Sequence, residues 1–259
     1  MDSLNVVTLS EASEADSECL AEMAKKAFDS DVDFGALAPG GPQGYDSTAF
    51  YTRSLRFLDC YVILLGEENV GGIMVNVSGS HGVVERIFVD PDQHRKGIGS
   101  KALELAIGRY PNVSLWTLGA PEWNTRTEQF FGKLGFKQVG WDQSDPKTRA
   151  RWFERRIGDS EAIMSIASLR EGMTNIVVEG KVAEKSYPRM VRSKKTGEAL
   201  MVANAALEDG SGRIVMVLWD NQFEAVKAGA WLRVENGYTN SYSGVTQLNV
   251  GYGRLIVLI

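Results

Sequence analysis

Hydrophobic and polar positions repeat with different periods in the two halves of the chain. In the first half, apolar residues at helical spacing alternate with short apolar runs, which predicts helices between strands. The expected helices cover about 15–28, 47–58, 97–108 and a segment ending near 134, and the expected strands cover 61–65, 70–77, 83–89 and 113–118. Such alternation indicates an α/β or α+β sheet domain.

The second half shows short strands separated by turns. Strands are expected at 176–183, 199–207, 213–219, 231–236 and at 247–250 with 254–258. One short helix, at about 221–227, is expected between the third and fourth strands. Five strands with a helix at this place follow the order of an OB barrel. The two halves join near 158–168, where residues 161–167 are predicted to form a short linker helix.

Length and composition are those of a folded protein with room for two domains. The chain has 259 residues, of which 44% are hydrophobic and 24% charged. No apolar run approaches the roughly 20 residues that span a bilayer. The first residues lack the basic flank and apolar stretch of a secretory signal. These features predict a cytoplasmic protein with no membrane contact.

Charge and metal-ligand residues narrow the possible partners. Residues 1–158 hold 17 Lys/Arg against 22 Asp/Glu, a balance of −5, and residues 159–259 hold 11 of each. Neither half is a polycation, so any nucleic-acid binding must come from a local face. The cysteines and histidines, Cys19, Cys60, His81 and His94, lack the spacing of a zinc site. We expect no metal and two ordinary core thiols.

A glycine turn after the third predicted strand is the most specific feature of the first half. The strand ends at Asp90, Pro91 breaks it, and a run from Arg95 to Gly99 leads into a helix. Glycines let a ligand approach the backbone, and the free amides at a helix start point toward anionic oxygens. The pattern therefore predicts a cradle for a phosphate group.

This segment resembles the pyrophosphate loop of the GNAT family of N-acetyltransferases, Gln/Arg-x-x-Gly-x-Gly/Ala, with His94 in the first position. The resemblance implies that acetyl-CoA binds here, with the backbone of the preceding strand pairing with pantetheine. The residues it assigns to the cofactor are Ile87, Phe88, Val89, His94, Arg95, Lys96, Gly97, Ile98, Gly99 and Ser100. A Rossmann-type or other glycine turn is the alternative interpretation of this segment.

A second stretch, 124–136, is similar to the family's Asn-x-x-Ala-x-x-Phe-Tyr-x-x-x-Gly-Phe helix and turn. The similarity implies that Asn124 contacts the pantetheine arm. Phe131 stands where the family often has a tyrosine general acid, and a phenyl ring cannot donate a proton. The two matches together cover most of residues 6–157. The thiolate must then leave without this acid, or with a proton from water or another donor.

The acceptor amine needs a base and a wall to hold it against the thioester. Glu85 is the best base candidate by its location, a surface or salt-bridged glutamate being the alternative, and His81 is a weaker candidate. The Gly/Pro-rich loop at 31–45 is the expected acceptor wall. Acidic residues at its start, Asp29, Asp31 and Asp33, either attract a cationic amine or form a solvated acidic run.

From about Leu169 onward the chain resembles the single-stranded-DNA-binding proteins of the replication-protein-A type. The stretches that carry the resemblance are 169–177, 203–205 with 209–214, 217–220 and 235–244. It implies base stacking on Trp219, Tyr238 and Tyr242, while Asn249 replaces a further aromatic residue. Cations from the loop between the first strands, Arg189, Arg192, Lys194 and Lys195, would clasp the backbone. Alternatively, Trp219 is a core residue and the tyrosines cap turns.

The sequence thus predicts an α+β, mixed-sheet acetyltransferase fold at 1–157, a linker at 158–168, and an all-β five-stranded OB barrel at 169–259. The favoured function is acetyl-CoA-dependent N-acetylation of an unknown amine, with a barrel that binds single-stranded DNA or RNA. One alternative is a small-molecule amine acetyltransferase whose barrel serves oligomerisation or protein contact. Another is a non-catalytic binder of acetyl-CoA or nucleic acid. A homo-oligomer is left open.

Overall fold

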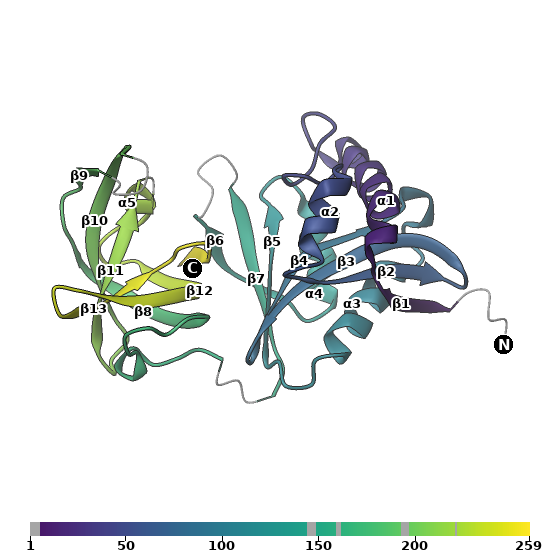
Figure 1. Ribbon diagram of the computed structural model, residues 1–259. Coiled ribbons are helices and arrows are strands. Elements are labelled where there is room, and N and C mark those ends of the chain that lie inside the picture. Colours follow the sequence, from purple (N-terminus) through teal and green to yellow (C-terminus); the bar gives the residue numbers. More distant parts are fainter. Residues whose placement is uncertain (1–5, 144–148, 159–161, 193–196, 221) are drawn as a thin grey trace. The chain divides into compact units, whose positions relative to one another are not determined.

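The structure, a computed structural model, describes residues 6–143, 149–158, 162–192, 197–220 and 222–259 (Figure 1). The chain divides into two compact units. Unit 1 contains Met1–Lys137 and Glu154–Gly158, and unit 2 contains Gln138–Phe153 and Asp159–Ile259.

Unit 1 is built on a mixed sheet with the order β1-β2-β3-β4-β5. Its strands are β1 (Val7–Glu11), β2 (Asp59–Leu65), β3 (Glu68–Ser78), β4 (His81–Val89) and β5 (Leu115–Pro121). The first four are antiparallel, and β5 runs parallel to β4. This arrangement, with its helices, confirms the predicted α+β class of the first domain. Strand β1 was not predicted, because it has five residues and only two of them are apolar.

Helices cover both faces of this sheet. The α-helices are α1 (Ser17–Asp29), α2 (Thr48–Ser54), α3 (Ile98–Gly108) and α4 (Thr125–Lys133), and short 3₁₀ turns are η2 (Glu14–Asp16), η3 (Ser30–Phe34) and η4 (Pro91–Gln93). Leu20 and Ala24 of α1 share one apolar cluster with Tyr51 of α2 and Phe88 of β4. Helices α1 and α2 therefore pack together on one face, and α3 lies on the other face in Figure 1.

Unit 2 contains a closed barrel. Its strands are β8 (Ile176–Lys185), β10 (Ala199–Glu208), β11 (Arg213–Trp219), β12 (Trp231–Tyr242), β13 (Val245–Asn249) and β14 (Arg254–Leu258), with β9 (Arg189–Arg192) beside β10 and the short helix α5 (Gln222–Ala225) between β11 and β12. The printed pairings close a ring, β8-β10-β11-β13-β12-β8. Leu207, Met216, Leu232 and Leu248 fill its interior. The predicted OB architecture is confirmed.

Most of a hairpin from before the predicted linker, Gln138–Phe153, also belongs to unit 2. Strand β6 (Lys137–Asp142) pairs with β14, Trp141 lying opposite Val257, and β7 (Ala150–Arg156) follows it. The approach is close, since a Cβ on Gly140 would lie 2.2 Å from the Val257 carbonyl oxygen. One boundary between the compact units lies after Gly158, and the others lie after Lys137 and Phe153. The β6–β14 pairing joins segments more than a hundred residues apart.

The predicted linker helix at 161–167 is wrong within the residues described there. Met164 forms a parallel bridge with Val178, and only a 3₁₀ turn, η5 (Ile166–Ser168), follows. The apolar side chains of Ile166 and Leu169 are buried in the barrel cluster, with Met164 packed against it. Burial in the barrel thus outweighs the helical pattern of this short segment.

Neither a membrane helix nor a metal cluster is found in the part of the chain that the structure describes. No helix there is both long enough and apolar enough to cross a bilayer. The same residues contain no group of three or more His, Cys, Asp or Glu side chains placed to hold a metal. Both cysteines are free thiols, Cys60 buried and Cys19 half-buried.

Candidate functional sites

Strands β4 and β5 separate halfway along β4. Their parallel pairing runs from His81 opposite Leu115 to Val84 opposite Leu118, and the described register ends there. Residues 85–89 of β4 continue to pair with β3 on the other side. The backbone of Ile87, Phe88 and Val89 therefore has one edge that β5 does not use. An extended ligand can add to such an edge as a further strand.

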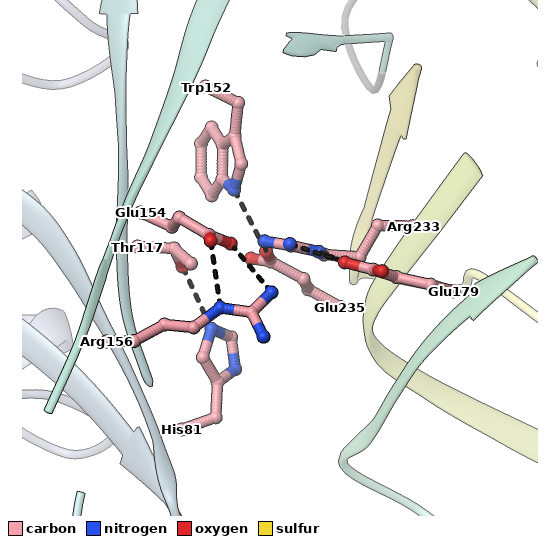
Figure 2. A network of polar contacts seen from close by, with 8 residues as sticks. All are labelled: His81, Thr117, Trp152, Glu154, Arg156, Glu179, Arg233 and Glu235. Carbon is pink, nitrogen blue, oxygen red and sulfur yellow. Dashed lines mark hydrogen bonds and ion pairs between the residues drawn. The ribbon is translucent and has the colours of Figure 1, made fainter. Parts of the chain in front are cut away.

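A β-bulge lies at the point of separation. The register of β3 against β4 shifts, with Val75 opposite Val84 and Met74 opposite Arg86. Glu85 is thus the extra residue, and it is half-buried. His81 lies instead in the paired part of the strands, where its Nε2 is 2.8 Å from Thr117 Oγ1 (Figure 2). Of the two base candidates, only Glu85 lies where the strands part.

The start of α3 follows the open end of β4. Gly97 caps this helix in the left-handed region, with φ of 78°, and no side chain caps it. The first amides of a helix have no partner within the helix and carry its positive dipole end. Arg95 also has a left-handed φ, 63°, and both Arg95 and Lys96 are exposed. The geometry is that of a backbone cradle for an anion.

Side chains hold this turn against the sheet. His94 Nε2 lies 2.8 Å from the Val89 carbonyl oxygen, so His94 ties the turn to the end of β4. Lys26 of α1 forms ion pairs with Asp90 at 2.8 Å and with Asp92 at 2.7 Å. Burial raises the pKa of Asp90, but bonds from Lys26 and the Asp92 amide outweigh it, leaving the pKa below its usual value. Asp90 therefore stays ionised and fixes the turn.

The second predicted motif forms α4 and its cap. Asn124 is buried, and its Oδ1 accepts a hydrogen bond of 3.3 Å from the Thr127 amide, as an N-cap. Phe131 is buried between Phe130 and Phe136, with ring centroids 5.0 and 6.0 Å away. Capping of α4 accounts for the hydrogen bond that Asn124 Oδ1 accepts. The contact of Asn124 with pantetheine stays a prediction. No proton donor occupies position 131.

Two of the three acidic residues near the loop already pair with cations. Asp29 pairs with Lys25 and accepts a 2.8 Å bond from the Tyr45 hydroxyl. Asp31 is buried and lies 2.7 Å from Arg126. Burial raises the pKa of Asp31, and the Arg126 charge opposes that rise. These contacts explain Asp29 and Asp31 as structural residues, so they offer little free charge to a cationic amine.

On the barrel, strand register places the three predicted stacking residues on one face. Tyr238 lies opposite Asn249, and Asn249 beside Val217. Tyr242 and Trp219 lie an even number of residues from Tyr238 and Val217, so their side chains share this face. The residues of opposite parity, such as Met216 and Leu248, are buried in the core.

Exposure distinguishes the interpretations of these aromatic residues. Trp219 is 37% exposed, Tyr238 38% and Tyr242 64%. Trp219 is therefore not a core residue. Asn249, at the position of the missing aromatic, is buried and donates a 3.0 Å bond to Asn240 Oδ1. This face offers three rings, and the family's further platform is replaced by an amide pair.

The structure does not place all the predicted cations on the aromatic face. Arg189 lies opposite Val202, which lies opposite Trp219, so exposed Arg189 shares the aromatic face. Arg192 is exposed but has the opposite parity on β9. Lys194 and Lys195 lie outside the described residues. The pairing of β9 with β10 places Arg189 on this face, and by parity Arg213 of β11 lies on it too. Strand β9 was not predicted.

Family models match both units separately. The model of the acetyltransferase (GNAT) family matches residues 31–136. The model of the single-stranded DNA binding protein Ssb-like OB fold matches residues 169–256. The chain therefore contains a GNAT acetyltransferase domain followed by an Ssb-like OB-fold domain.

Individual relatives match one domain each. The single-stranded DNA binding protein Ssb of Saccharolobus solfataricus is 28% identical over 86 residues, 33% of this chain and 57% of that protein. Peptidyl-lysine N-acetyltransferase YjaB of Salmonella typhimurium is 31% identical over 85 residues, 33% of this chain and 54% of that protein. An acetyltransferase structure from Thermus thermophilus superposes with a TM-score of 0.50 at 17% identity, covering 60% of this chain and 99% of its own. The chain spans about half the length of these curated relatives.

Proposed function

We propose that the first domain transfers an acetyl group from acetyl-CoA to an amine. The observation that carries this proposal is the separation of β4 from β5 beside the glycine-capped start of α3. The open strand edge suits an extended pantetheine arm, and the amides of residues 97–100 suit its diphosphate. The matching family model supports the same assignment.

The residues suggest how the amine is activated. Glu85, at the bulge where the strands part, accepts the proton that the attacking nitrogen loses. The new bond joins nitrogen to the acetyl carbon, and the bond from that carbon to sulfur breaks. Since Phe131 cannot supply a proton, coenzyme A leaves as a thiolate and takes its proton from solvent.

Calorimetric titration with acetyl-CoA, followed by an acceptor screen, tests the proposal. We expect saturable binding at one site per chain, and release of free thiol that depends on an added amine. The screen should include peptides, polyamines and amino acids, each with and without a single-stranded oligonucleotide. Absence of saturable acetyl-CoA binding would remove both enzymatic interpretations and leave a non-catalytic protein.

We further propose that the barrel binds single-stranded DNA or RNA through its aromatic face. Three exposed rings on one face with Arg189 at its edge support base stacking beside a phosphate contact. The barrel would then bring the acetyltransferase to nucleic acid or to proteins bound there. If it serves oligomerisation or protein contact instead, substitutions on this face will leave oligonucleotide affinity unchanged.

Replacing Trp219 with alanine should weaken oligonucleotide binding by about 5- to 150-fold, since one stacked base contributes about 1–3 kcal/mol. Fluorescence anisotropy with a labelled single strand at fixed salt measures this. Trp231→Ala is the matched control, because Trp231 is 50% exposed but pairs with Lys181 of β8, away from β11 and β13. Equal losses in both variants would contradict the assignment of the face.

A further inference from the structure

One buried cation in unit 1 has no counter-ion among the residues that the structure describes. Arg86 of β4 is 9% exposed, and its Nη1 is shielded from solvent without a hydrogen-bond partner. Its Nη2 donates to the carbonyl oxygen of Gln43. Within the described ranges, no carboxylate forms an ion pair with Arg86. Arginine cannot lose its proton to avoid this situation, so the charge persists.

The surroundings of Arg86 give only partial compensation. The guanidinium carbon lies 4.0 Å from the centre of the Phe50 ring and 5.9 Å from that of Tyr51. Ring faces attract cations, but less strongly than a carboxylate does at the same site. Burial raises the pKa of Tyr51, while hydrogen bonding and charge from Arg86 oppose that rise. Tyr51 is therefore a neutral phenol and supplies no negative charge.

Arg233, in unit 2, is a comparable buried cation that has counter-ions. It is 1% exposed, and it pairs with Glu179 and with Glu235. An isolated buried charge is costly, and folded proteins normally pair it. The absence of such a partner at Arg86, within the described residues, therefore indicates a position completed by a ligand.

The location of Arg86 indicates which substrate would supply this ligand. It directly precedes Ile87, the first residue of the strand edge proposed for pantetheine. The bulge at Glu85 puts Arg86 on the Met74 face of the sheet, together with Phe88 and helix α2. Its other contact, Gln43, belongs to the loop expected to form the acceptor wall. The charge thus lies on the acceptor side of the proposed reaction site.

We propose that Arg86 binds a carboxylate of the acceptor, so that the preferred substrates are amines that also carry a carboxylate, as amino acids and acidic peptides do. This inference rests on the proposed acetyltransferase function. One guanidinium matches one negative charge, and a planar carboxylate fits its fork. The ionised carboxylate displaces the neutral Gln43 carbonyl from Nη2 and also reaches Nη1.

Matched acceptors test the proposal in the wild-type chain without any substitution. Each amino acid is compared with its carboxamide, and peptides beginning with Asp or Glu are compared with those beginning with Asn or Gln. We expect KM to be at least tenfold lower for the carboxylate member in one of these sets. Phosphorylated amines form a separate arm, and a preference for them over carboxylates would overturn the choice of group.

Substitution then assigns the preference to Arg86. Arg86→Met should raise KM for the carboxylate acceptor at least tenfold more than it raises KM for the amide partner. Arg86→Lys keeps the charge, loses the fork and should give an intermediate KM. Arg53→Met, at an exposed arginine of neighbouring α2, is the matched control and should change neither.

The outcomes separate this inference from the proposed function. If acetyl-CoA binds and amines are acetylated without a carboxylate preference, the assignment of Arg86 fails and the acetyltransferase stands. Equal losses on carboxylate and amide acceptors in Arg86→Met would show a structural role instead. If Arg86→Met does not fold, Arg86→Lys and the wild-type acceptor pairs decide the question. Failure to bind acetyl-CoA at all contradicts the proposed function itself.

Discussion

Arg233→Met is expected to lower the free energy of unfolding of unit 2 by about 3–5 kcal/mol, the usual effect of removing one partner of a buried ion pair. Arg233 and Glu235 are each 1% exposed, and Arg233 Nη1 lies 3.4 Å from Glu235 Oε1. Glu235 also accepts a 2.9 Å bond from Trp152 Nε1 (Figure 2). Without the guanidinium, the buried carboxylate of Glu235 loses this ion pair.

A double variant distinguishes this explanation from simple loss of packing. In Arg233→Met with Glu235→Gln the carboxylate charge is gone as well, so much of the lost stability should return. The matched control is Arg213→Met on the same barrel, whose side chain is 51% exposed and pairs with Glu184 and Glu208. Arg213→Met should lower the free energy of unfolding by no more than about 1 kcal/mol. Urea unfolding of the full chains gives all values, and equal losses at Arg233 and Arg213 would contradict the argument.

The parts of the fold that depend on local pattern could be predicted from the sequence. Strands β3, β4, β10 and β11 are long apolar runs or clear alternations, and a glycine lies within two residues before each of them. The strands that were missed, β1, β6, β7 and β9, are short or polar, and β1 and β6 pair with strands far along the chain. The pairing of β6 with β14 is the clearest case. Nothing local in Trp141 or Gly140 identifies Val257 as a neighbour.

The features of the candidate sites also differ in whether the sequence alone could predict them. The glycine turn at the start of α3 could be located because its chemistry lies within a few consecutive residues. The environment of Arg86 could not, since it depends on a bulge at Glu85, a loop carbonyl at Gln43 and a ring on α2. Strict alternation would place Val84 and Arg86 on one face, whereas the bulge places them on opposite faces. Whether a buried charge has a counter-ion depends on contacts between distant segments of the folded chain, which the local sequence does not show.

Ser100→Glu is expected to weaken acetyl-CoA binding at least tenfold while leaving the fold intact or slightly more stable. Ser100 lies in the first turn of α3, where an acidic side chain interacts favourably with the helix dipole, by about 0.3–1 kcal/mol. The same carboxylate would face the diphosphate. At an effective dielectric constant of about 20, two like charges about 4 Å apart repel by about 4 kcal/mol, far more than the helix gains.

Ser100→Glu is expected to stabilise the helix and to weaken acetyl-CoA binding, so a loss of affinity cannot be explained by a loss of stability. Ser100→Gln is the matched control, because it adds similar bulk without charge and should bind acetyl-CoA much more tightly than Ser100→Glu. Calorimetric titration gives the affinities and thermal unfolding gives the stabilities. Raising the salt concentration should narrow the difference between the two variants, since the repulsion is screened. If the glutamate variant binds acetyl-CoA as well as wild type, the first turn of α3 does not hold the diphosphate, whatever the family resemblance implies.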